Sequence, residues 1–389
     1  MKFTQSIFAA AFAFAAAAAF AAPVTTQGVG VGKHGDIQVA VTFDNGKIQK
    51  IDILKNAENP VLAKKVFTDL KDQIVAANSV QLDGISGATF TSKGLFAAVE
   101  DAAKKAGVTL GQADKKALKA AVKDLPKDAS YDVVVIGAGG AGFSAAIEAK
   151  NAGATVVLLE KMPQVGGNSL ISGAEMNAAK NWVQPKLGIT DDSPELHAKD
   201  TYLGGDKKGD MKVINVMTHN ALAGAEWCRD YLGVRFEPDN LFFFGGHSRK
   251  RALIPVGHTG TEFITKFQAK ADELGIPVIT NMKAEELIKD KSGRVVGVKA
   301  TMNGAEYTFN AKGGVVLATG GFGANPAMVK KYNPKIDERF KTTDAPGTTG
   351  EALYMAQRAG AELVNMQYIQ TYPICDPISG VIELIADAR

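Results

Sequence analysis

A glycine-rich loop between two apolar stretches constrains the fold of this chain more than any other sequence feature. The loop has the pattern Gly-x-Gly-x-x-Gly, formed by Gly137, Gly139 and Gly142. The almost continuous apolar run 131–136 before it is typical of a strand inside a parallel sheet, and the Ala-rich run after it, up to residue 152, is typical of a helix. A second apolar run, 155–159, completes a strand–helix–strand unit. Further along, residues 296–302 and 307–310 predict a hairpin around Asn303-Gly304, and residues 314–318 predict another buried strand. We therefore predict an α/β fold for this part of the chain.

The spacing within the loop indicates a dinucleotide-binding site. In loops of this kind the first glycine makes a tight turn, the second lets the backbone approach a pyrophosphate, and the third lets helix and strand pack closely. Glu160 follows the second strand, where a carboxylate can accept hydrogen bonds from a ribose. A glycine-rich turn without a ligand is the alternative. The small residues and amides between 166 and 178 favour FAD over NAD, but the residues alone leave that choice open.

Residues 131–389 resemble the FAD subunit of the fumarate reductase and succinate dehydrogenase family, especially its soluble periplasmic members. The resemblance implies a Rossmann-like FAD-binding domain in which the flavin passes hydride to a carbon–carbon double bond. It is carried by the segments Gly137–Gly142, Glu160-Lys161, Gly166-Gly167-Asn168, Met176-Asn177-Ala178, Ala318-Thr319-Gly320-Gly321-Phe322 and Thr349-Gly350-Glu351. The residues expected to hold FAD are Gly137, Ala138, Gly139, Gly140, Ala141, Gly142, Glu160, Lys161, Gly166, Gly167, Asn168, Ser169, Ala174, Met176, Asn177, Thr319, Gly320, Gly321, Thr349, Gly350 and Glu351.

The first residues of the chain predict an export signal. Lys2 gives a positive start, an apolar Ala/Phe run follows at 7–20, and Ala19-Phe20-Ala21 offers a small-x-small cleavage site. A membrane anchor is the alternative, but the run is short for crossing about 30 Å of hydrocarbon. We therefore expect a signal peptide at residues 1–21 and a mature protein in the periplasm.

Residues 22–108 predict a small α+β domain. Residues 37–43 alternate apolar and polar side chains, 44–47 form a turn signal, and a return strand runs over 48–53. Helical spacing follows at 61–77 and again at 94–106, with a Gly-rich loop at 83–92 between the two helices. Residues 109–129 are rich in Lys, Asp and Ala, and we interpret them as a solvated helix and linker, with a basic docking face as the alternative.

The loop Asp83-Gly84-Ile85-Ser86-Gly87-Ala88-Thr89 resembles the motif of FMN-binding domains in which FMN is joined to a threonine through a phosphoester. The resemblance makes Thr89 the attachment residue and implies a separate flavin transferase as a partner. Gly84 and Gly87 leave room for the backbone to approach a bulky ligand, and Ser86 between them is expected to contact it. Thr91, Ser92 and the helix start can donate hydrogen bonds to phosphate. Without the resemblance, the same residues describe a plain turn and helix cap.

The cysteine pattern bears on how electrons would enter. Cys228 and Cys375 are too far apart in sequence for a CxxC metal site or a CxxCH haem site. Soluble periplasmic fumarate reductases often receive electrons from an attached haem domain, and here the FMN-binding domain takes that position. The implied route runs from an external donor, such as a quinol-oxidising cytochrome of anaerobic respiration, to FMN, then FAD, then the substrate.

Two further classes of function have no support in the sequence. The formal net charge of only +3 gives no electrostatic basis for nucleic-acid binding. The five histidines show no metal-ligand spacing, so no metal site is predicted. His247, Arg249 and His258 lie in a Gly-rich stretch that either borders the cofactor or forms a solvated loop.

The substrate is suggested by a departure from the fumarate reductase pattern. That pattern places a His-Pro and a later Thr-Glu around the second carboxylate of the substrate, where this chain has Tyr372-Pro373 and Ala386-Asp387. Asp387 would repel a dianion such as fumarate but could accept a charge-assisted hydrogen bond from a ring N–H. The combination resembles family members that reduce urocanate to imidazole propionate, with Tyr372 and Asp387 holding the imidazole. Fumarate or another enoate is the alternative, and so is an ordinary aromatic at 372 with a surface charge at 387.

These observations divide the chain into a signal peptide (1–21), an FMN-binding domain (22–108), a linker (109–129), a FAD-binding domain (130–364) and the start of a truncated cap domain (365–389). In the family, the proton-donating Arg lies further along the chain, and Arg389 does not match it. The catalytic residue is therefore left unassigned. A fragment of a flavin-dependent reductase is one interpretation, and a periplasmic flavin electron carrier without turnover is the other.

Overall fold

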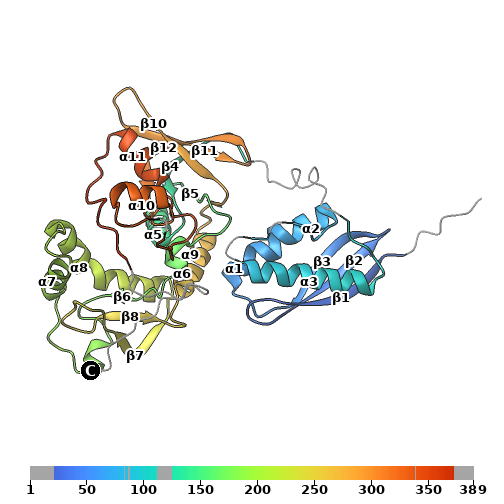
Figure 1. The fold of residues 1–389 in the computed structure, drawn as a ribbon, viewed down its shortest axis with the longest axis horizontal. Coiled ribbons are helices and arrows are strands. Elements are labelled where there is room, and N and C mark those ends of the chain that lie inside the picture. The colour runs from blue at the N-terminus through green and yellow to red at the C-terminus, as the bar shows by residue number, and fades with distance from the viewer. Residues whose placement is uncertain (1–21, 83, 86–87, 112–124, 338, 372–389) are drawn as a thin grey trace, which may run out of the picture. The chain divides into compact units, whose positions relative to one another are not determined.

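The structure of the chain is a computed structural model, which describes residues 22–82, 84–85, 88–111, 125–337 and 339–371 (Figure 1). The predicted signal peptide 1–21, most of the predicted linker and the predicted site residues Ser86, Gly87, Tyr372 and Asp387 lie outside these residues. The chain separates into two compact units, the first made mainly of residues up to 122 and the second mainly of residues from 123 onward.

The first unit contains an antiparallel sheet of three strands, β1 (Val24–Val31), β2 (Asp36–Asp44) and β3 (Lys47–Lys55), in the order β1-β2-β3. Asn45 and Gly46 join β2 to β3 with positive φ angles of 48° and 74°, which suit a two-residue hairpin turn. Alternate residues of β2 are buried, so one face of the sheet forms the core. The hairpin predicted from residues 37–53 is confirmed.

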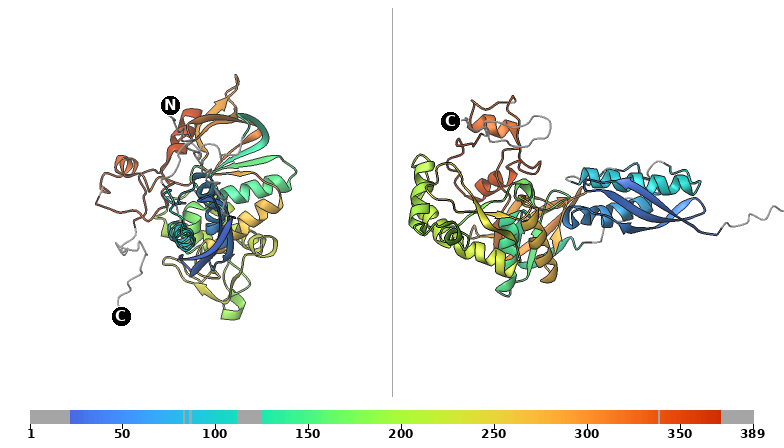
Figure 2. Two further views of the ribbon diagram at one scale, coloured as in Figure 1. Left: turned by 90° about the vertical axis from the view of Figure 1, so that its right-hand side faces the viewer. Right: turned by 90° about the horizontal axis from the view of Figure 1, so that it is seen from below.

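Helix α3 (Thr89–Lys105) lies along β1 with backbone close to backbone (Figure 2). A Cβ atom on Gly28 would lie 1.9 Å from the carbonyl oxygen of Ala98, and one on Gly30 would lie 2.0 Å from that of Gly94. Only glycine lets the strand and the helix approach so closely. Sequence analysis missed β1 because the residues that face α3 are glycines, which leave no apolar alternation to detect.

The connection from β3 to α3 is helical. It consists of α1 (Pro60–Lys65), a π-helical turn η1 (Val66–Leu70) and α2 (Lys71–Ala77), which confirms the helical prediction for 61–77. The prediction that the next helix begins at 94 was wrong, because α3 begins at Thr89. The N-cap is Ala88, which has no side-chain oxygen to cap the helix, so the usual sequence signal for a helix start is missing.

The second unit is built on a mixed sheet of six strands in the order β10-β11-β12-β4-β5-β9. Strands β12, β4, β5 and β9 are parallel, while β10, β11 and β12 are antiparallel. The bounds are β4 (Asp128–Ile136), β5 (Val156–Leu159), β9 (Val278–Ile279), β10 (Lys283–Lys289), β11 (Val295–Met302) and β12 (Ala305–Leu317). The prediction of an α/β fold with a parallel core is confirmed.

Both faces of the central strands β4 and β5 contribute to buried cores, as expected of parallel strands. Val135 and Leu158 pack on one face with helices α5 (Gly140–Asn151) and α9 (Thr261–Glu273), which run next to each other (Figure 2). The Phe143 and Phe267 rings of these helices stack with centroids 5.8 Å apart. The intervening residues of β4 and β5 belong to a second core on the opposite face. Continuous apolar runs therefore mark β4 and β5 in the sequence.

The hairpin predicted around Asn303-Gly304 is confirmed as β11–β12. The separate strand predicted from Gly314 to Ala318 is the second half of β12, which continues through an irregularity between Ala311 and Gly314. A Cβ on Gly313 would lie 2.8 Å from the carbonyl oxygen of Asp132, so glycine lets β12 stay against β4 at that point.

A smaller sheet, β6-β8-β7, and several helices complete the second unit. A third apolar core lies beneath this sheet. The strands are β6 (Met176–Asn177), β7 (Phe236–Phe242) and β8 (Ala252–Pro255), and the remaining helices are α6 (Gly167–Ile171), η2 (Gln184–Leu187), α7 (Pro194–Gly204), α8 (Met211–Glu226), η3 (Trp227–Tyr231), α10 (Pro326–Tyr332) and α11 (Glu351–Ala359).

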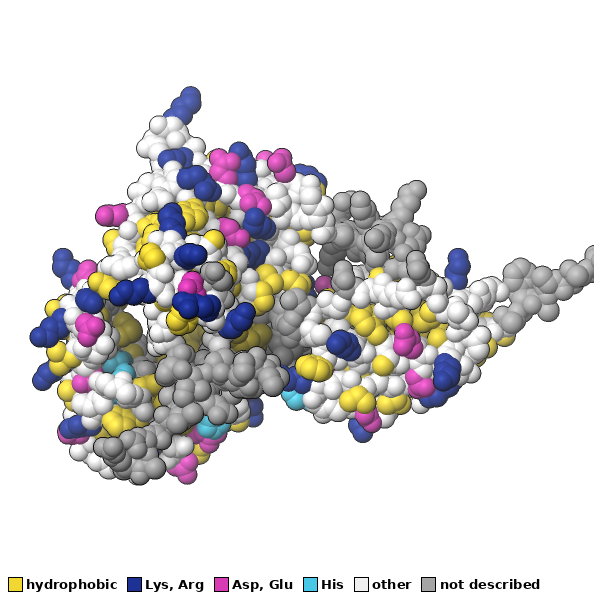
Figure 3. Space-filling model, in the orientation of Figure 1, with side chains coloured by type: hydrophobic (Ala, Val, Ile, Leu, Met, Phe, Trp, Pro, Cys, Tyr) yellow, Lys and Arg dark blue, Asp and Glu magenta, His cyan; other side chains and the backbone are white. Residues whose placement is uncertain are grey.

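On the face of the second unit shown in Figure 3, Lys and Arg side chains are interspersed with Asp and Glu. Within the described part of the chain, none of the helices combines the length and the apolar character needed to cross a membrane.

Candidate functional site

The glycine-rich loop between β4 and α5 has the geometry that its spacing predicts. Gly137 leaves β4 with a φ of 101°, a conformation that favours glycine. A Cβ on Gly142 would lie only 1.8 Å from the carbonyl oxygen of Gly137, so the helix can close on the turn only without a side chain there. Gly139 is the N-cap of α5, and it has no side chain that could cap the helix. The first backbone N–H groups of α5 therefore form a place for phosphate oxygens.

Glu160 lies directly beside this loop, as predicted. One oxygen of its carboxylate accepts a hydrogen bond from the Ala138 backbone N–H at 2.9 Å, and the other accepts one from the Met162 N–H at 2.8 Å. Glu160 is almost fully buried at the end of β5. An ionised carboxylate can accept further hydrogen bonds on each oxygen, so Glu160 keeps capacity for the hydroxyl groups of a ribose.

The segment after Glu160 folds back onto the loop. The Gly166 N–H donates to the Ala138 carbonyl oxygen at 2.7 Å, and the Gly140 N–H donates to the Ser169 hydroxyl at 3.1 Å. Gly166 has a φ of 109°, which only glycine adopts readily. At Gly167 an added Cβ would meet no atom within 4 Å. The turn therefore leaves open space beside the loop for a bulky ligand.

Asn168 brings a distant part of the chain to the same place. Its side-chain amide donates to an Asp344 carboxylate oxygen at 2.5 Å, and its carbonyl oxygen accepts from the Ala345 N–H at 2.5 Å. These contacts hold the segment around residue 345 next to the start of α6.

Lys161, Thr349 and Glu351 form a second long-range cluster. The Lys161 ammonium donates to the Glu351 carboxylate at 2.9 Å and to the Thr349 hydroxyl, and this hydroxyl also contacts Glu351. Burial alone would raise the pKa of Glu351, but the Thr349 and Lys161 hydrogen bonds outweigh it and lower the pKa to about 2. The predicted residues Lys161, Thr349 and Glu351 are thus brought together, and Gly350 is the N-cap of α11 with a φ of 79°.

We expect Glu351→Gln to lower stability only above the ordinary pKa of glutamate. Because the folded pKa, about 2, lies below the ordinary value of 4.5, the ion pair stabilises the folded state above pH 4.5 and is lost as the pH falls toward 2. The Glu351 side chain is about half exposed, so the effect at neutral pH should stay below about 1 kcal/mol.

Thermal unfolding at pH 7 and at pH 3 measures this effect, with Glu362→Gln, an exposed glutamate outside the cluster, as the matched control. The difference between Glu351→Gln and wild type should shrink at pH 3. A difference that grows at pH 3 would show that the cluster does not act through the charge of Glu351.

The remaining predicted FAD residues lie at strand ends, in loops and in the first turn of α5 of the same unit. Ala141 is exposed in the first turn of α5, and Ala174 has a φ of 57°, unusual for a residue with a side chain. Gly320 and Gly321 follow Thr319 and are exposed, with open space where a Cβ would lie. Met176 pairs with Leu253 of β8, which fixes the neighbouring Asn177.

Unsatisfied polar atoms test whether these residues suit a ligand. Among the described residues, four buried side-chain atoms have no hydrogen-bond partner: Gln164 Nε2, Asn177 Oδ1, Gln184 Oε1 and His197 Nδ1. Buried polar atoms are normally paired, and Gln164 lies two residues before Gly166, so its unpaired amide fits a site for a polar ligand such as FAD beside that turn. Gln164 was missed by sequence analysis, since a single glutamine in a loop carries no motif.

The candidate FMN site lies at the start of α3. Thr89 is the first residue of this helix and is exposed, and Ala88 before it provides no side-chain cap. A Cβ on Gly84 would lie 3.0 Å from the Cβ of Ser92, so glycine lets this loop approach the first turn of the helix. An uncapped helix start beside an exposed hydroxyl fits a phosphate that is esterified to Thr89.

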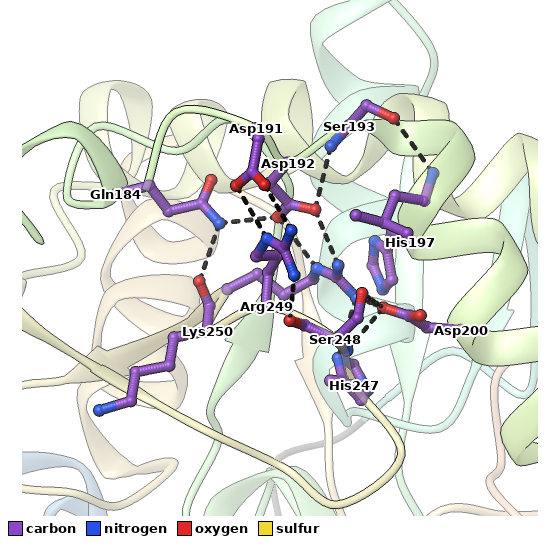
Figure 4. A network of polar contacts seen from close by, with 12 residues as sticks. Gln184, Asp191, Asp192, Ser193, His197, Asp200, His247, Ser248, Arg249 and Lys250 are labelled. Carbon is purple, nitrogen blue, oxygen red and sulfur yellow. Dashed lines mark hydrogen bonds and ion pairs between the residues drawn. The ribbon is translucent and has the colours of Figure 1, made fainter. Parts of the chain in front are cut away.

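His247, Arg249 and His258 are not brought together as one site. Partly exposed Arg249 forms an ion pair with Asp191, and exposed His258 lies 3.9 Å from a Glu237 carboxylate oxygen. His247 instead belongs to a buried polar network (Figure 4).

The centre of that network is Arg251, which is 0% exposed. Its guanidinium donates to both carboxylate oxygens of Asp192, at 2.7 and 3.0 Å, and to Asp200 at 2.7 Å. Asp200 also accepts from the backbone and hydroxyl of Ser248, so the network fixes the segment before β8 against α7 (Figure 4). Burial lowers the pKa of neighbouring His197 to about 4, which leaves it neutral near pH 7. Sequence analysis identified neither Arg251 nor His197.

Comparison with known proteins finds a family for each of the two units. Residues 132–388 match the model of a family described as FAD binding domain, and residues 32–104 match the model of an FMN-binding domain. The chain is 42% identical over 367 residues to a urocanate reductase from Eggerthella lenta, covering 93% of this chain and 60% of that protein. It is 36% identical over 271 residues to a fumarate reductase (cytochrome) from Shewanella frigidimarina, covering 69% of this chain and 46% of that protein.

A solved structure gives the same result for the fold. The open conformation of a flavocytochrome c3 fumarate reductase superimposes with a TM-score of 0.62 at 32% identity, over 71% of this chain and 48% of that chain. This chain thus spans about half to three fifths of the length of these relatives. The chain belongs to the family of flavoproteins with this FAD-binding domain, and it carries an FMN-binding domain ahead of it.

Proposed function

We propose that this protein is a flavin-dependent reductase of an α,β-unsaturated carboxylate, with urocanate as its substrate and imidazole propionate as its product. The observation that carries the proposal is the combination, in one chain, of a unit with an exposed threonine at an uncapped helix start and a unit with a built FAD cradle. Its similarity to a urocanate reductase, at 42% identity, supports the choice of substrate.

FAD in the second unit would supply hydride chemistry at its isoalloxazine ring. The residues of the chain would bind and orient it: the N–H groups at the start of α5 would face the pyrophosphate, and Glu160 would accept hydrogen bonds from the ribose. The two bonds that Glu160 receives from Ala138 and Met162 hold the carboxylate in place for this role.

Thr89 would carry FMN through a phosphoester, attached by a flavin transferase. Electrons from an external donor, such as a quinol-oxidising cytochrome, would pass to the FMN on Thr89 and from there to the FAD site. We place the protein in the periplasm, because Lys2 and the apolar run before Ala21 have the pattern of an export signal.

Tyr372 and Asp387 are the proposed contacts to the imidazole ring. A carboxylate at 387 would accept a charge-assisted hydrogen bond from a ring N–H and would disfavour the second carboxylate of fumarate. We expect Asp387→Asn to lower kcat/KM for urocanate at least about tenfold, equivalent to about 1.4 kcal/mol. Activity with fumarate should fall less or rise.

The measurement is oxidation of reduced viologen by the protein with urocanate or with fumarate. Glu383→Gln, which removes a negative charge four residues before Asp387 in the sequence, is the matched control and should leave the preference for urocanate unchanged. Faster turnover of fumarate by the wild-type protein would contradict the substrate assignment. Bound FMN and FAD without reduction of either enoate would instead favour an electron carrier.

A further inference from the structure

Hydroxyl side chains are concentrated in the first turn of α3. Thr89, Thr91 and Ser92 all lie within four consecutive residues, so any of the three could in principle accept a phosphate. The structure separates them by burial. Thr89 is exposed, whereas Thr91 is 3% and Ser92 is 1% exposed. A bulky flavin donor can therefore reach the hydroxyl of Thr89 but not the other two.

The buried hydroxyls are also engaged in hydrogen bonds. Ser92 donates to the carbonyl oxygen of Ala88 at 2.9 Å. Thr91 donates to the carboxylate of Glu58, a residue between β3 and α1 that is 7% exposed. An ionised carboxylate only accepts hydrogen bonds, so the proton of the Thr91 hydroxyl points toward Glu58.

Glu58 is held from a second side by the turn between β1 and β2. Its other carboxylate oxygen accepts from the His34 N–H at 2.8 Å, and the His34 imidazole lies 3.7 Å from the oxygen that Thr91 contacts. A Cβ on Gly32 would lie 2.4 Å from Glu58, so glycine makes room for the carboxylate. Glu58 therefore joins the β1–β2 turn to the first turn of α3.

The charge state of Glu58 agrees with this role. Burial alone would raise its pKa, but the hydrogen bonds from the His34 N–H and the Thr91 hydroxyl outweigh burial and leave the pKa below its usual value. A carboxylate beside a hydroxyl can also activate it as a nucleophile. At Thr91 such activation would not lead to flavin transfer, because the donor cannot reach the buried hydroxyl.

We propose that Glu58 is a positioning residue that makes Thr89 the single flavin acceptor, by holding Thr91 buried and fixing the first turn of α3. This rests on the proposed attachment of FMN to Thr89. In that step the Thr89 oxygen bonds to the FMN phosphorus of a flavin carrying a phosphoanhydride. The anhydride P–O bond breaks, a nucleoside monophosphate leaves with the bonding electrons, and the hydroxyl proton passes to a base of the transferase.

The test is flavin transfer to the apoprotein by its transferase, with FAD as the donor, followed by site-resolved mass spectrometry. Wild type should carry flavin on Thr89 alone. Glu58→Ala should lower kcat/KM for transfer at least tenfold and should bring the ratio of flavin on Thr91 to flavin on Thr89 at least tenfold above the detection limit, below which the wild-type ratio lies. Glu58→Gln, which keeps an acceptor oxygen, should give values of both quantities between those of wild type and Glu58→Ala. If Glu58→Ala does not fold, Glu58→Gln provides the test.

Val41→Ala is the control for a purely structural effect, because Val41 is fully buried in β2 and pairs with Thr26 and Ile51 rather than with the β1–β2 turn. It should lower the melting temperature while leaving all flavin on Thr89. The proposal would be overturned if both Glu58 variants were modified at the wild-type rate and on Thr89 alone. The transferase would then recognise only the local sequence around Thr89. Wild-type protein without flavin at Thr89 would instead refute the attachment itself.

Discussion

Replacing Thr89 with alanine should remove all covalently bound FMN and leave the FAD content unchanged. Thr89 is the exposed hydroxyl at the start of α3, whereas Thr91 and Ser92 are buried and donate to Glu58 and Ala88. No neighbouring hydroxyl should therefore replace it. If electrons pass through FMN, reduction of substrate by the natural donor should fall to background, while reduction by viologen should persist.

The measurement combines mass spectrometry of the peptide around residue 89 with activity from the two electron sources. Thr25→Ala is the matched control, because Thr25 is an exposed threonine of β1 in the same unit and should not carry flavin. Full activity of Thr89→Ala with the natural donor would contradict the electron route. Flavin on another residue would contradict the selectivity of the site.

Two glycines of the β4–α5 loop should respond differently to the same added methyl group. At Gly142 a Cβ would lie 1.8 Å from the Gly137 carbonyl oxygen, so Gly142→Ala should distort the loop, lower stability by about 1–3 kcal/mol and abolish FAD binding. At Gly139 the nearest atom to a Cβ would be the Ser169 hydroxyl at 3.6 Å, an ordinary contact. Gly139→Ala should therefore fold normally.

Measuring the affinity of the two variants for FAD distinguishes an effect on folding from an effect on contact with the ligand. If the backbone at Gly139 approaches a pyrophosphate, Gly139→Ala should weaken FAD binding at least about tenfold, or about 1.4 kcal/mol, with the melting temperature of the apoprotein unchanged. Titration of apoprotein with FAD and thermal unfolding without FAD provide both values. Normal FAD affinity in Gly139→Ala would show that the second glycine of the motif does not face the cofactor.

The parts of the fold that sequence analysis predicted are those set by short-range patterns. The β4–α5–β5 unit, the Asn45-Gly46 hairpin and the Asn303-Gly304 hairpin each follow from strand periodicity next to turn residues. Strand β1 and the first turn of α3 do not, because Gly28, Gly30 and Ala88 carry no local signal. The reason for small residues at these positions becomes clear only from the packing of α3 against β1.

The sequence by itself determined that a dinucleotide loop with Glu160 at its side forms within one strand–helix–strand unit. The tertiary structure alone decided that Lys161 meets Glu351, that Asn168 meets Asp344, and that Glu58 holds Thr91. The physical reason is distance along the chain. Periodicity and turn chemistry act over a few residues, whereas these contacts depend on how whole elements pack.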